Sequence, residues 1–224
     1  MEKEKGEQVM SNDYFADGLL AKLDAADPVF AAYEAQDVSR DVGFDFADFQ
    51  DVVPRALDEI RETKEAYEEQ HQDVEGHEHF GDEIADIMFS LINLARHAGL
   101  NDLPSLDDLL AKANVRSAEE INTIELVDDI GTRIVAVADV EKTDQEKIKE
   151  AMGVLFEEGM VDSILIANAN DFDPKALLVE NVRKYLDRCQ AIEQLAAEDG
   201  KQWSDLSANN EIIAYWKRAK TLLK

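Results

Sequence analysis

Apolar residues recur at intervals of three and four along most of the chain, which is the pattern of helices that bury one face. Residues 1–12 are predicted to be a charged, frayed start. The pattern predicts an all-α fold with helices over residues 13–34, broken at Asp27-Pro28, and over 49–70, 77–97, 105–114, 118–138, 144–169, 173–199 and 209–223.

Two of these segments differ from the rest in their pattern. Residues 77–97 are apolar around much of the helix, which predicts the most buried helix of the fold. The Val-rich stretch 133–140 fits either the end of a helix or a strand, and the pattern alone leaves both open.

Composition and charge narrow the class of protein. The 224 residues are 45% hydrophobic and 33% charged, which is typical of a globular protein. The net charge of −27 excludes a nucleic-acid duplex as partner, because the sequence offers no basic patch to neutralise phosphates. The excess of acid fits either a salty habitat or simple solubility.

The expected compartment is the cytoplasm. No apolar run is long enough to cross a bilayer, and the first residues, MEKEKGEQ, do not form a signal peptide. The single cysteine, Cys189, excludes an internal disulfide and fits a reducing environment. We therefore expect neither a membrane nor a nucleic acid as partner.

Carboxylates gather in two tight groups on neighbouring predicted helices. Those within each group share a helix face, and a polar turn at 70–76 allows the two helices to run antiparallel. Such a concentration of negative charge repels itself unless a cation neutralises it, and oxygen ligands suit Mg²⁺ or Mn²⁺. The first group is Asp58, Glu59 and Glu62, and the second is Glu83 and Asp86.

Positive charge is concentrated late in this acidic chain. Lys184 and Arg188 are one helical turn apart, and so are Trp216 and Lys220. Paired cations indicate an anion with several oxygens, and an aromatic ring beside a cation indicates a flat group joined to that anion. A nucleotide polyphosphate held with Mg²⁺ satisfies both patterns.

Five short motifs resemble those of the MazG family of all-α nucleoside triphosphate pyrophosphohydrolases. They lie in the family's order, within residues 28–100 and 172–220. The motifs are QDVSRDVGFDF at 36–46, DEIRE at 58–62, EIAD at 83–86, KYLDR at 184–188 and WKRAK at 216–220.

The resemblance implies a fold, an activity and residue roles. The expected fold is a four-helix-bundle core that is completed by dimerisation, so a homodimer or higher homo-oligomer is expected. The expected activity is Mg²⁺-dependent hydrolysis of a ribo- or deoxynucleoside triphosphate to a monophosphate and pyrophosphate. The implied metal ligands are Asp58, Glu59, Glu62, Glu83 and Asp86. The last four of these are also implied to be catalytic. The implied substrate contacts are Asn93, Lys184, Arg188, Trp216 and Lys220.

Two departures from the family pattern bear on this hypothesis. Asp58 stands where the family motif begins with Glu. Residues 101–171 form a mostly helical insertion, so the expected catalytic core is 1–100 with 172–224, in which 1–27 is an N-terminal extension. The insertion could be a lid, a specificity element or an oligomer contact.

Two other functions fit the same sequence. A nucleotide-binding regulator without catalysis, using the insertion as its partner surface, would also carry these motifs. A purely structural helical bundle would bind neither Mg²⁺ nor a nucleotide. His77 and His79 are two positions apart and are expected to be surface histidines, because such residues do not share a helix face.

Overall fold

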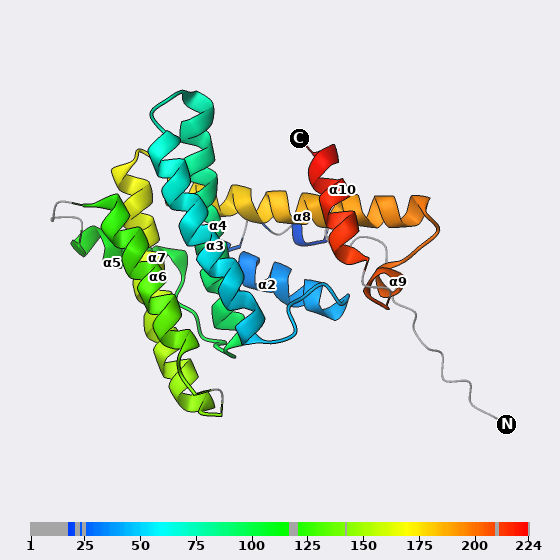
Figure 1. Ribbon diagram of the computed structural model, residues 1–224, viewed down its shortest axis with the longest axis horizontal. Coiled ribbons are helices and arrows are strands. Elements are labelled where there is room, and N and C mark those ends of the chain that lie inside the picture. The colour runs from blue at the N-terminus through cyan, green and yellow to red at the C-terminus, as the bar shows by residue number, and fades with distance from the viewer. Residues whose placement is uncertain are drawn as a thin grey trace.

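A computed structural model describes residues 18–20, 23, 26–116, 121–141, 143–208 and 211–223, and all regular structure in these residues is helical (Figure 1). This confirms the predicted all-α class. The helices are α2 (Pro28–Asp41), α3 (Phe49–Glu69), α4 (Val74–His97), α5 (Leu106–Arg116), α6 (Thr123–Ala138), α7 (Gln145–Ala169), α8 (Pro174–Glu198), α9 (Trp203–Ala208) and α10 (Ile212–Leu222).

Side-chain caps explain where many of the helices begin. In each case an Asp or Asn accepts a hydrogen bond from a backbone N–H of the first turn, which would otherwise have no partner. The capping residues are Asp27, Asp48, Asp73, Asn122, Asp144 and Asp173.

These caps also account for the differences from the predicted boundaries. Asp73 accepts from Gly76 N at 2.8 Å, so α4 begins three residues before the predicted start at 77. Asn122 caps α6, which begins at Thr123, and residues 118–120 of the predicted helix lie outside the described residues. The strand alternative for 133–140 is wrong, because 133–138 belong to α6. The short helix α9 was not predicted.

Four helices, α3, α4, α6 and α7, surround the larger hydrophobic core. Helix α3 packs against α4 and α6, and α7 packs against the same two helices, so the set closes on itself. Figure 1 shows them side by side, with α8 roughly perpendicular to them and extending away from α4. One cluster of buried apolar residues extends through α3, α4 and the α6–α7 hairpin. The 101–171 segment is therefore packed into this core.

Helix α8 joins this bundle to the C-terminal helices. Its first half contacts α4 and α7, and its second half packs against α9 and α10 around a separate apolar cluster that includes Cys189 and Trp203. Figure 1 shows α10 standing over the end of α8 that lies away from the bundle.

An ion cluster fixes the helices of the 101–171 segment to one another. Asp162 of α7 is fully buried and pairs with Arg133 of α6 at 2.6 Å and with Arg116 of α5 at 2.9 Å. A carboxylate without solvent is stable only with such partners, so these three helices are held in one arrangement. Within the described residues, no helix has the length and apolarity that crossing a membrane requires.

Close packing between α7 and α4 yields a stability prediction. A Cβ on Gly159 would lie 3.0 Å from Cδ1 of the fully buried Leu91, whereas a Cβ on Gly153 of the same helix would meet nothing within 4 Å. Gly159→Val should lower the free energy of unfolding by on the order of 2 kcal/mol through overpacking. Gly153→Val should change it little. Chemical denaturation measures both, and equal effects would contradict this packing.

Candidate metal and nucleotide site

Glu59 and Glu62 of α3 and Glu83 of α4 form a carboxylate cluster. One oxygen from each lies within 4.8 Å of the others. Thr63 helps to hold the two helices in register, because its hydroxyl donates to Glu59 O at 2.7 Å and contacts Glu83 O at 3.3 Å. The two predicted groups of acids therefore do meet at one place.

The cluster is largely shielded from water. Glu59 is 3% exposed and Glu83 is 7% exposed, and Oε2 of each is buried without a hydrogen-bond partner. A buried carboxylate oxygen without a donor is costly, and a cation is the usual way to satisfy it.

Asp86 lies one turn beyond Glu83 on α4 and adjoins the cluster. Its Oδ1 accepts a hydrogen bond of 2.6 Å from Nδ2 of Asn181 on α8. Asn181 was missed in the sequence, although it precedes Lys184 by one helical turn and so shares its face.

Burial raises the pKa values of these acids. The pKa of Glu59 rises to about 8, first through burial and then through repulsion by Asp86, and the pKa of Glu83 rises to about 7 for the same reasons. Burial also raises the pKa of Asp86, while the Asn181 hydrogen bond and the charges of Arg55 and Arg188 lower it. A divalent cation would reverse these shifts by favouring the ionised forms.

Arg61 of α3 lies 3.2 Å from Glu62 Oε1, and Arg55 of the same helix contacts the buried part of the cluster. One Nη atom of Arg55 lies 2.5 Å from Glu59 Oε1, and the other lies 3.9 Å from Glu62 Oε1. It was also missed in the sequence, although it stands four residues before Glu59, the spacing of a helical ion pair.

Asp58 lies apart from the cluster. Its side chain is 55% exposed and faces Arg61 at 3.8 Å. The neighbouring position along a helix points about 100° away, which explains why Asp58 leaves the face that Glu59 occupies. Its role as a metal ligand stays a prediction that this placement does not favour.

The predicted phosphate-binding residues come from α8 and α10. Lys184 donates to both oxygens of Asp82 at 2.7 and 2.9 Å, and Asp82 directly precedes Glu83 on α4. Arg188 lies over the Trp216 ring at 5.5 Å from its centre and is close enough to Asp86 to lower its pKa. Lys220 is exposed on α10, one turn after Trp216.

Trp216 belongs to an aromatic cluster between α8, α10 and the 43–48 loop. Its ring centre lies 5.1 Å from that of Phe44 and 5.7 Å from that of Tyr185. Phe44 also stacks on Trp203 and Tyr185. Trp216 is half-buried, with Arg188 over its ring and Phe44 and Tyr185 packed beside it.

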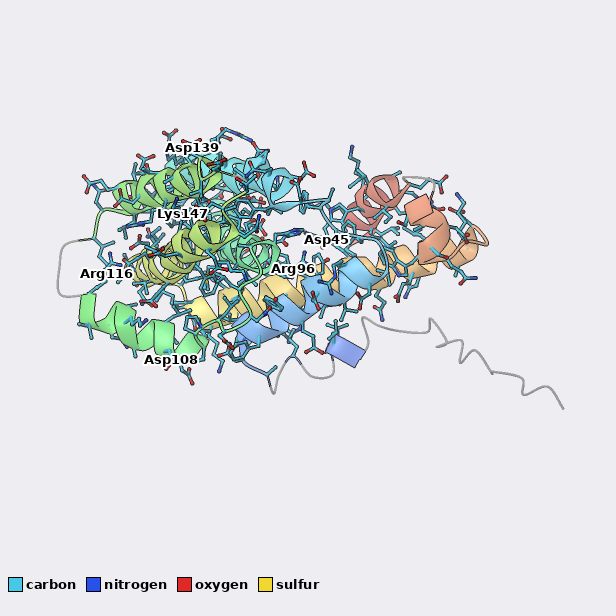
Figure 2. The ribbon with its side chains drawn as sticks, turned by 90° about the horizontal axis from the view of Figure 1, so that it is seen from below. Asp45, Arg96, Asp108, Arg116, Asp139 and Lys147 are labelled. Carbon is cyan, nitrogen blue, oxygen red and sulfur yellow. The ribbon has the colours of Figure 1, made fainter. Side chains whose placement is uncertain are left out.

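The loop that carries Phe44 is fastened to the end of α4. Asp45 Oδ1 contacts Arg96 Nη at 2.5 Å and His97 Nε2 at 2.9 Å, and Figure 2 shows Asp45 beside Arg96. These partners outweigh the effect of burial and lower the pKa of Asp45 to about 2. Asn93 joins this network, because its Oδ1 accepts from Arg96 at 3.1 Å. The structure thus places Asn93 with the loop anchor.

The two histidines of α4 have different surroundings. His77 stacks on Phe172 with ring centres 4.3 Å apart. His79 is half exposed, and its Nδ1 lies 3.5 Å from Glu83 Oε1, one turn further along the helix. His79 therefore adjoins the edge of the carboxylate cluster.

The residues present fit a hard divalent cation such as Mg²⁺ or Mn²⁺. The donors are carboxylate oxygens, and two of these are buried without a hydrogen-bond partner. No protein-family model, curated protein or solved structure matches this chain. Functional inference therefore rests on the chain's own residues.

The raised pKa values predict that the metal-free protein loses stability as pH rises. Folding favours the protonated forms of Glu59 and Glu83, so their contribution is complete below about pH 4.5 and is lost as pH rises through about 7 and 8. Glu59→Gln should reduce the loss between pH 5 and pH 8 by on the order of 2 kcal/mol.

Denaturant unfolding in a chelator, at several pH values, measures this difference. Glu65→Gln is the matched control, because Glu65 is an exposed acid on the same helix. Parallel stability curves for the wild type and Glu59→Gln would contradict the electrostatic description of the cluster.

Proposed function

We propose that the protein hydrolyses nucleoside triphosphates to the monophosphate and pyrophosphate in a Mg²⁺-dependent reaction. The observation that carries the proposal is the carboxylate cluster, whose unpaired buried oxygens adjoin the cationic face of α8. The resemblance of five motifs to the MazG family supports the same reaction.

In this proposal each group of residues has a separate task. Glu59, Glu62, Glu83 and Asp86 hold Mg²⁺. The bound ion neutralises phosphate charge and lowers the pKa of a water. Arg188 and Lys220 bind phosphate oxygens, and Lys184 does so by leaving Asp82. Trp216 contacts the nucleoside through its aromatic ring.

The bond changes follow from this arrangement. The water oxygen attacks the α-phosphorus. The bond that breaks joins this phosphorus to the oxygen shared with the β-phosphorus. Pyrophosphate leaves with that oxygen. An unpaired carboxylate oxygen in the cluster, such as Glu59 Oε2, accepts the proton that the water loses.

The oligomeric state and the cellular compartment are also proposed as the sequence predicts them. A homodimer or higher homo-oligomer in the cytoplasm remains our proposal, supported by the family resemblance and by the buried single cysteine. A dimer is not needed to place four helices around the core, because α6 and α7 already pack against α3 and α4.

Product analysis of purified protein tests the reaction directly. With Mg²⁺ and a panel of nucleoside triphosphates, we expect pyrophosphate release, and Glu83→Gln or Asp86→Asn should reduce turnover at least about 100-fold. Asp58→Asn is the matched control on the exposed side of α3, and it should retain turnover within about threefold.

Other products would change the conclusion. Release of single phosphate would reject cleavage between the α and β phosphorus atoms. Nucleotide binding without turnover at any metal concentration would identify a binding regulator instead.

The proposed nucleoside contact yields a second test. Trp216→Leu should raise KM for nucleotides about tenfold by removing the aromatic face, while kcat changes little. Inorganic tripolyphosphate has no base, so its inhibition constant should be the same for the variant and the wild type. Equal weakening of both ligands would show that Trp216 supports the fold or the phosphate site.

A further inference from the structure

Arg55 is the one described cation in ion-pair contact with the buried carboxylate Glu59, apart from any bound metal. It lies 2.5 Å from Glu59 Oε1 and reaches towards Glu62 at 3.9 Å. Glu59 and Glu83 each keep a second buried oxygen without a partner, so Arg55 satisfies only part of the cluster.

Arg55 pairs alone with its buried carboxylate, whereas the buried Asp162 pairs with two arginines, of which Arg116 is about as exposed as Arg55. The side chain of Arg55 is 45% exposed while its partner Glu59 is almost fully buried. The guanidinium therefore covers the cluster from the solvent side and can turn outward without opening the core.

The influence of Arg55 extends beyond the residue it touches. Its charge lowers the pKa values of Glu59, Glu83 and Asp86. A divalent cation bound to the same carboxylates would meet this positive charge at close range, where like charges repel. Arg55 also contacts Glu59 Oε1, so a metal bound through both oxygens of this carboxylate would have to displace it.

We propose that Arg55 is a built-in counter-cation that competes with the divalent metal for Glu59. Metal binding displaces the guanidinium from Glu59 towards solvent. The inference rests on the proposed metal site, and it adds a residue that sets the affinity of that site. Arg55 thus protects the fold when metal is scarce and weakens metal binding when metal is present.

Removing the charge of Arg55 tests the competition. At pH 8.5 and low ionic strength, with no nucleotide, Arg55→Gln should bind Mn²⁺ about tenfold more tightly than the wild type, by calorimetry. The variant should also show a larger rise in melting temperature on adding Mn²⁺, because its metal-free cluster is uncompensated. Neither measurement depends on turnover.

Two control variants separate competition from a general change of charge. Arg55→Lys keeps the charge and should bind Mn²⁺ within about threefold of the wild type. Lys64→Gln also removes one positive charge from α3. Lys64 pairs with Asp128 of α6 and lies about 200° around the helix from Glu62, so this variant should change Mn²⁺ affinity little. Arg55→Met gives the same test as the Gln variant if circular dichroism shows the latter to be unfolded.

The outcomes distinguish this inference from the proposed function. If the wild type binds Mn²⁺ and releases pyrophosphate but Arg55→Gln binds no more tightly, only the inference is overturned. If neither protein binds Mn²⁺, the metal site and the inference both fail. Binding by Arg55→Gln where the wild type shows none would support the competition.

Discussion

The burial of acidic side chains between α3 and α4 is the constraint on which the rest of the site depends. Glu59 and Glu83 are about as inaccessible as the buried Ile60 and Ile84 that follow them, yet each retains a carboxylate oxygen without a donor. Folding alone gains nothing from such an arrangement, because apolar residues of similar size would pack there at lower cost. The arrangement is stable only with protons, Arg55 or a metal, and this gives it a functional meaning.

The surrounding helices can be understood from this constraint. Helix α8 packs against α4 so that Asn181 holds Asp86 and Arg188 lies near it, and α10 brings Trp216 beneath Arg188. The α6–α7 hairpin contacts α3 through Ile60 and Lys64, which lie on the other side of that helix from Glu62. The hairpin therefore supports the carboxylate cluster from the side of α3 that faces away from Glu62.

Helical periodicity was sufficient to predict the fold class, most helix positions and the meeting of the two carboxylate groups. It failed where a single capping residue sets the boundary, as at Asp73, because such a signal is local and carries no periodicity. The motif resemblance named Asp58 as a ligand, but adjacent residues on a helix point in different directions, and this one faces solvent. Arg55 and Asn181 lie outside the quoted motifs, and their contacts depend on side-chain geometry and on how α8 packs against α4.

The α6–α7 hairpin has a consequence for how the bundle holds together. Two of the four helices around the larger core belong to the 101–171 segment, and the polypeptide itself connects them to the other two. A covalent connection keeps the effective concentration of the second helix pair high at any dilution of the protein. The geometry of the carboxylate cluster is thus independent of protein concentration, unlike that of a bundle assembled from separate chains.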